Sequence, residues 1–151
     1  MVSSKVIQRC TNVVAPALAP GEQIQMIEVL QLGKVSAKRQ VATAAVAGIA
    51  SGGLLIVAAR PRPYLMVMTD QRIALVDFVN TNVGKKIALS VPRANFKAGP
   101  LKGHLLTYSM QVDTIDPAMS YRFSWGRAQA KIAKRVAAAL GSPIAAADQT
   151  V

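Results

Sequence analysis

Few residues in this chain have the chemistry of a catalytic or metal site. His104 is the only histidine and Cys10 the only cysteine, so neither an internal disulfide nor a zinc site with several thiolates can form. No Asp, Glu or Cys lies near His104 in sequence, which argues against a ligand set or an acid–base dyad. The seven carboxylates fall mostly in expected turns or singly in strands: Glu22, Glu28, Asp70, Asp77, Asp113, Asp116 and Asp148. We therefore expect no enzymatic activity, no metal and no cofactor.

Positive charge is the chemistry that the sequence does offer. Eighteen Lys and Arg stand against seven Asp and Glu, which gives a net charge of +11 spread along the chain. This charge favours phosphate-bearing partners, either anionic lipids or nucleic acid, although a basic surface without a partner is the alternative. One basic stripe falls on the expected C-terminal helix and contains Arg127, Lys131, Lys134 and Arg135. Because no aromatic residues are interleaved with it to stack on bases, nucleic-acid binding is the least favoured of these roles.

An uncharged run, residues 41–59, interrupts this basic sequence. As a helix it would just cross a hydrocarbon core of about 30 Å. We expect the residues before and after this run to form strands of one sheet. A single span would put these strands on opposite sides of the bilayer, where they could not pair. A re-entrant or interfacial helix is compatible with the fold. So is a helix that packs on a copy of itself through the small residues Ala44, Gly48 and Gly52.

The periodicity of the flanking segments predicts mostly β structure. Apolar residues spaced by three and four indicate a short helix over residues 3–14, with Ser3 or Ser4 as its N-cap. Runs rich in β-forming residues predict seven strands, at 23–33, 64–68, 72–79, 85–91, 94–98, 104–112 and 119–125. Thr69-Asp70-Gln71 has the length and composition of a hairpin turn. In 104–112, strict alternation places Leu106, Tyr108, Met110 and Val112 toward the core.

A C-terminal helix is expected over residues 126–141. Its apolar face consists of Ala128, Ile132, Val136 and Leu140, and Gly141 ends it. The fold class is therefore mainly β: a seven-stranded antiparallel barrel or sandwich with a capping C-terminal helix and a short N-terminal helix. We divide the chain into an N-terminal helix and linker (1–22), a β domain (23–141) that carries the apolar insertion 41–59, and a disordered tail (142–151).

Three segments resemble the bacterial pleckstrin-homology-like domain family. They are LAPGEQI (18–24), the YLMVMTDQRIALVD hairpin (64–77), and YRFSWGRAQAKIAKRVAAAL (121–140). The resemblance implies a pleckstrin-homology-like fold with a binding or scaffolding role, and neither cofactor nor catalysis. The chain departs from the family pattern in the loop between the first two strands, which is normally short and here contains the apolar run.

The resemblance also implies a phosphate-binding site at that loop. In pleckstrin-homology domains that bind inositol phosphates, cations at the end of the first strand and the start of the second contact the head group. The corresponding residues here are Lys34, Lys38, Arg39, Arg60 and Arg62. Membrane or partner contact is assigned to the larger apolar residues of the run, Val46, Ile49, Leu54, Leu55 and Ile56.

Two functions follow as expectations. The first is association with an anionic membrane surface, by a cytoplasmic protein peripheral to the inner membrane, through the apolar loop and its flanking cations. The second is protein interaction or self-assembly into a homo-oligomer, in which the Ala/Gly-rich segment docks on partner subunits.

Overall fold

The structure is a computed structural model and describes residues 2–34, 62–115 and 119–142. Its helices are α1 (Ser4–Val14) and α3 (Ala130–Ala139), with single 3-10 turns η1 (Ala15–Ala17), η2 (Arg93–Asn95) and η3 (Arg127–Gln129). Its strands are β1 (Ile24–Lys34), β2 (Arg62–Thr69), β3 (Arg72–Val79), β4 (Asn82–Pro92), β5 (Phe96–Ala98), β6 (Lys102–Gly103), β7 (Thr107–Thr114) and β8 (Met119–Gly126). The predicted mainly-β class with a helix before and after the strands is confirmed. The described residues form eight strands and not the predicted seven, because the two-residue strand β6 has no sequence pattern of its own.

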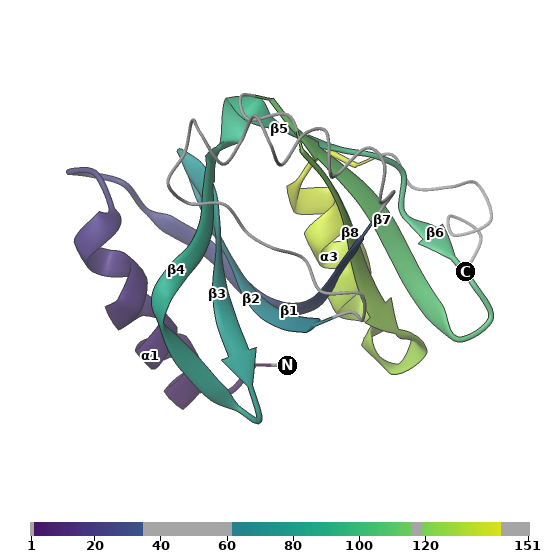
Figure 1. Cartoon of the computed structure of the whole chain (residues 1–151), viewed down its shortest axis with the longest axis horizontal. Helices are drawn as coiled ribbons and strands as arrows, with labels where there is room; N and C mark the ends of the chain where they lie inside the picture. Colours follow the sequence, from purple (N-terminus) through teal and green to yellow (C-terminus); the bar gives the residue numbers. More distant parts are fainter. Residues whose placement is uncertain (1, 35–61, 116–118, 143–151) are drawn as a thin grey trace.

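All of these strands join one antiparallel sheet. Its order is β4-β3-β2-β1-β8-β7-β5, and the two-residue strand β6 pairs with β7. The sheet bends sharply, so that the β2–β4 half and the β5–β7 half face different directions, with β1 and β8 between them (Figure 1). Among the described strands, β4 and β5 are open edges, so the sheet folds over the core without closing into a barrel.

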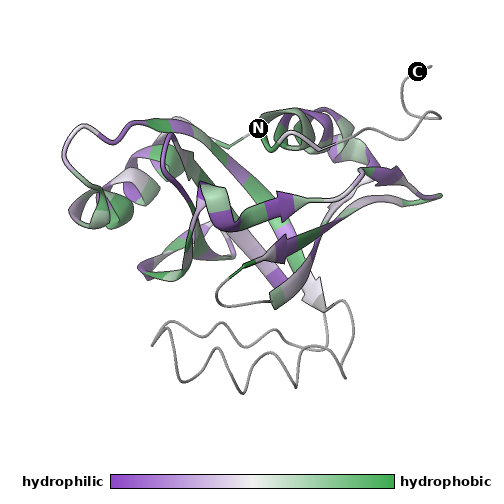
Figure 2. Cartoon of the chain, turned by 90° about the horizontal axis from the view of Figure 1, so that it is seen from above, coloured by the Kyte–Doolittle hydropathy of each residue, from purple (hydrophilic) through white to green (hydrophobic). Residues whose placement is uncertain are grey.

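The central strands β2 and β3 are buried on both faces. Tyr64 and Met66 of β2 belong to the main core, which α3 also lines, whereas Leu65 and Val67 belong to a second core cluster beneath α1. Because successive strand residues point to opposite faces, both faces need apolar residues here. Figure 2 shows that α1 and α3 lie on separate parts of the molecule, as two covered faces require.

Helix α1 follows the predicted pattern. The Ser3 side chain caps it by accepting a hydrogen bond from the amide of Val6. Val6, Cys10 and Val14 recur every four residues and are the buried residues of the helix. Cys10 has no exposed surface, and burial raises the pKa of its thiol to about 11. The thiol is therefore a small apolar group of the core, as predicted.

Helix α3 starts later than the sequence suggests. Residues 127–129 form the 3-10 turn η3, so Ala128 is exposed and the prediction that it belongs to the apolar face is wrong. Ile132 and Val136 are buried against the sheet. Gly141 adopts a positive φ of 71° and ends the helix, which confirms the predicted C-cap.

The strand predicted at 104–112 begins only at Thr107. Leu106 was expected to face the core, but 75% of its surface is exposed, and for Leu105 the value is 86%. From Tyr108 onward the predicted alternation is correct, because Tyr108, Met110 and Val112 are buried. The two leucines lie in the turn between β6 and β7, where the His104 amide donates to the Thr107 carbonyl at 2.7 Å. Within the described residues, no helix has both the length and the apolar character needed to cross a bilayer.

Candidate functional site

The two ends of the predicted binding loop leave the sheet side by side. β1 and β2 pair in register up to Leu32 and Arg62, so the backbones of Lys34 and Arg62 lie at the same end of adjacent strands. Arg62 is the predicted cation whose side chain the structure describes. The other predicted cations, Lys38, Arg39 and Arg60, and the predicted apolar contacts, Val46, Ile49, Leu54, Leu55 and Ile56, lie outside the described residues.

Arg62 already has an acidic neighbour. Its guanidinium donates to Asp77 Oδ2 at 3.2 Å, lies at the same distance from Oδ1, and approaches the Tyr64 ring at 5.9 Å from the centroid. The side chains of Arg62 and Asp77 are 48% and 41% exposed. An ion pair this exposed contributes about 0–1 kcal/mol to stability. Asp77 therefore holds the Arg62 guanidinium only weakly, and about half of that side chain is open to solvent.

Two lysines that were not predicted to belong to the binding loop lie at the same end of the sheet. Lys85 and Lys86 are exposed residues of β4, close to the tight β3–β4 turn at Asn80 and Thr81. Both stand outside the ion pairs formed among the described residues. In the sequence these residues stand out only as two adjacent lysines after a turn. Their position close to Arg62 follows from the strand pairing alone.

Gly84 brings this part of β4 close to β3. A Cβ atom at Gly84 would lie 2.7 Å from the Cβ of Asp77, a separation that real Cβ atoms do not show. The strand pairing is also irregular around Asp77. The Arg62–Asp77 pair therefore lies next to the segment that carries the two lysines.

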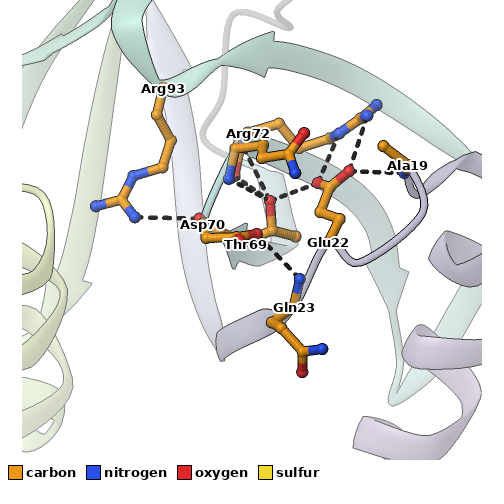
Figure 3. Close-up of polar contacts among 8 residues, drawn as sticks. Ala19, Glu22, Gln23, Thr69, Asp70, Arg72 and Arg93 are labelled. Atoms are coloured by element: carbon orange, nitrogen blue, oxygen red, sulfur yellow. Dashed lines mark hydrogen bonds and ion pairs between the residues drawn. The ribbon is translucent and has the colours of Figure 1, made fainter.

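Two of the three segments that carry the family resemblance, 18–24 and 64–77, meet at the other end of β1 and β2 (Figure 3). Glu22 precedes β1 and accepts hydrogen bonds from Arg72 through both carboxylate oxygens, at 2.9 and 3.0 Å. Thr69 donates to the same carboxylate at 2.5 Å, and the Ala19 amide donates at 2.9 Å. Asp70 accepts from the backbone amide of Gln23 at 3.0 Å. We call Glu22, Thr69, Asp70 and Arg72 the polar clamp.

The polar clamp is a structural feature. Burial would raise the pKa of Glu22, but hydrogen bonds from Thr69, Arg72 and Ala19 and the charge of Arg72 outweigh this and lower the pKa to about 2. Each Glu22 oxygen already accepts two hydrogen bonds, so the carboxylate has no position left for a ligand. The clamp lies seven residues of β2 away from Arg62, roughly 23 Å along an extended strand. It fixes the strands that carry the candidate site.

The basic stripe lies on η3 and α3, and two of its four cations form contacts within the molecule. Arg135 donates to the buried carboxylate of Glu28 at 2.5 Å. Arg127 donates to the Tyr108 hydroxyl at 2.8 Å and to the Leu105 carbonyl at 3.2 Å. Of the four predicted cations, Lys131 and Lys134 remain outside such contacts among the described residues. This reduces the charge available to follow a nucleic-acid backbone.

Similarity to known proteins is found among solved structures and not among family models or curated sequences. No family model matches this chain, and no curated protein matches it. Among solved structures, it is similar to the hSac2 domain from human phosphoinositide phosphatase Sac2, with a TM-score of 0.44 and 13% sequence identity. The match covers 94% of this chain and 89% of that one.

Proposed function

We propose that this chain is a non-enzymatic pleckstrin-homology-like module that associates with anionic membrane surfaces through one end of its sheet. Support comes chiefly from the pairing of β1 and β2, which brings the two ends of segment 35–61 together next to Arg62. Lys85 and Lys86 add exposed positive charge at the same end. Each such cation is worth about 1 kcal/mol close to an anionic surface. The uncharged run 41–59 would supply the apolar contact.

Vesicle co-sedimentation tests this proposal. The intact chain and a variant lacking residues 41–59 are compared on phosphatidylcholine vesicles with and without 30% phosphatidylglycerol. We expect binding only with the anionic lipid, and a loss of at least fivefold in the deletion variant. Residual binding by that variant should disappear at high salt, because salt screens charges and not apolar contacts. Equal binding of the two proteins, or no preference for anionic lipid, would exclude the proposal.

Protein interaction is the second candidate, and the turn between β6 and β7 is the observation that favours it. Leu105 and Leu106 are exposed there, and Arg127 holds both: its backbone amide donates to the Leu106 carbonyl at 3.1 Å and its side chain to that of Leu105. An exposed apolar pair on a fixed backbone suits a protein partner or a second copy. Size-exclusion chromatography with light scattering tests self-assembly, and a monomer at tens of micromolar would reject it.

A further inference from the structure

A polar groove lies on the face of β7 and β8 that points away from the core. It has a volume of about 650 Å³ and includes Lys102, His104, Ser109, Arg122 and Ser124 in its lining. Its size falls within the range of about 300–1,000 Å³ that is usual for small-ligand sites. None of the membrane contacts proposed above belongs to it.

Strand register explains why these side chains converge. Tyr121, Phe123 and Trp125 of β8 point into the core, so Arg122 and Ser124, which alternate with them, point outward. Ser124 pairs directly with Ser109 of β7, and Ser109 in turn pairs with Lys102 of β6. Directly paired residues lie on the same face of a sheet, with Cβ atoms about 5 Å apart. A row of two hydroxyls and one ammonium group therefore crosses the groove.

Arg122 and His104 complete the set of donors. Arg122 pairs with Gln111 of β7 on one side and with Gly33 of β1 on the other, so β1 places no side chain beside the guanidinium. His104 Nε2 lies 2.9 Å from the Ser109 hydroxyl oxygen. Hydroxyl, imidazole, ammonium and guanidinium groups are the usual side-chain ligands of phosphate.

The groove also contains one carboxylate, which is already hydrogen-bonded. Asp113 accepts from the Ser120 hydroxyl at 2.6 Å and from the Gln111 amide at 3.2 Å. Lys102 and Arg122, in contrast, form no ion pair with another described residue. The charged lining thus carries two cations against one carboxylate.

We propose that this groove binds the phosphate monoester group of a small phosphorylated ligand. Arg122 is the principal phosphate ligand, Lys102 adds a second charge, and the hydroxyls of Ser109 and Ser124 donate to the remaining phosphate oxygens. The same chemistry fits a soluble phosphate ester and a phosphorylated lipid head group. The groove and its ligand do not depend on the membrane proposal.

Calorimetry and amide chemical shifts of the full chain test the groove, with inositol 1,4-bisphosphate and inorganic phosphate as probes. We expect saturable shifts at the amides of Ser109, Arg122 and Ser124. Arg122→Gln should weaken bisphosphate binding at least tenfold, whereas Lys131→Gln, which removes an exposed charge from α3, should change it less than twofold. Ser124→Ala, which leaves the charge unchanged, should weaken it about threefold. Thermal unfolding checks that each variant is folded.

Two results would overturn the proposal: no saturable shifts with either probe, or equal losses in R122Q and K131Q, which would mean that net charge alone attracts the anion. Phosphatidylcholine vesicles with 5% phosphatidylinositol 4-phosphate distinguish the sources of the phosphate. If R122Q abolishes recruitment to these vesicles, the ligand is a lipid head group. If the soluble bisphosphate binds and the vesicles recruit nothing through Arg122, it is a soluble ester. The variant lacking residues 41–59 should bind the bisphosphate normally, so failure of the membrane proposal leaves this result unaffected.

Discussion

At the scale of single residues, Glu22 is a carboxylate whose pKa is strongly lowered by its surroundings. Its pKa is lowered to about 2 from an ordinary value of 4.5, so the unfolded chain binds the proton more tightly than the folded one. The stability that Glu22 contributes is therefore complete above about pH 5 and is lost as the pH falls toward 2. The difference in free energy of unfolding between wild type and Glu22→Gln should shrink over this interval in urea titrations. A difference that stays constant from pH 6 to pH 2.5 would contradict the role assigned to the polar clamp.

Cys10 gives a second test at the same scale. Its thiol is fully buried and its pKa is raised to about 11, so at pH 8 the folded protein holds it neutral and out of reach of reagents. We expect a disulfide reagent such as 5,5′-dithiobis(2-nitrobenzoate) to modify Cys10 at least a hundredfold more slowly in the native protein than in 6 M guanidinium chloride. Similar rates in the two conditions would show that α1 does not cover the thiol.

At the scale of elements, hydrophobic periodicity predicted the residue ranges of helices and strands correctly where the element packs on the core along its whole length. Helix α1, the β2–β3 hairpin and β8 follow their predicted ranges closely for this reason. The pattern failed at Leu106, because period two continues into the β6–β7 turn, where the backbone no longer follows the sheet. Contacts between distant segments were not predictable: Glu22 and Arg72 are 50 residues apart, and no local pattern relates them.

Because β7 begins at Thr107, substitutions of Leu106 and Met110 should differ in their effect on the free energy of unfolding. Leu106→Ala should lower the free energy of unfolding by less than about 0.5 kcal/mol, because the side chain is 75% exposed. Met110→Ala should lower it by about 2–5 kcal/mol, because Met110 is 1% exposed within the main core. Chemical denaturation measures both, and a cost above 2 kcal/mol at Leu106 would restore the predicted inward orientation.

At the scale of the whole molecule, the dominant feature is the excess of Lys and Arg over Asp and Glu. The described residues form three ion pairs, Arg62–Asp77, Arg72–Glu22 and Arg135–Glu28. Each pair uses one charge of each sign, so the net charge of +11 is unchanged by them. Composition predicted this charge, but the position of the unpaired cations depends on strand pairing. Register places Lys85 and Lys86 at the end of the sheet where segment 35–61 begins and ends, whereas Lys131 and Lys134 lie on α3.

The most direct test of membrane association compares these two pairs of lysines. Lys85→Gln/Lys86→Gln and Lys131→Gln/Lys134→Gln remove the same charge from different parts of the surface, and both are measured against phosphatidylcholine vesicles with 30% phosphatidylglycerol. If the end of the sheet beside segment 35–61 contacts the membrane, the first variant should bind about 10- to 30-fold more weakly, at about 1 kcal/mol per cation. The second should bind within twofold of wild type. Equal losses in the two variants, or a larger loss in the second, would contradict membrane contact through this end of the sheet.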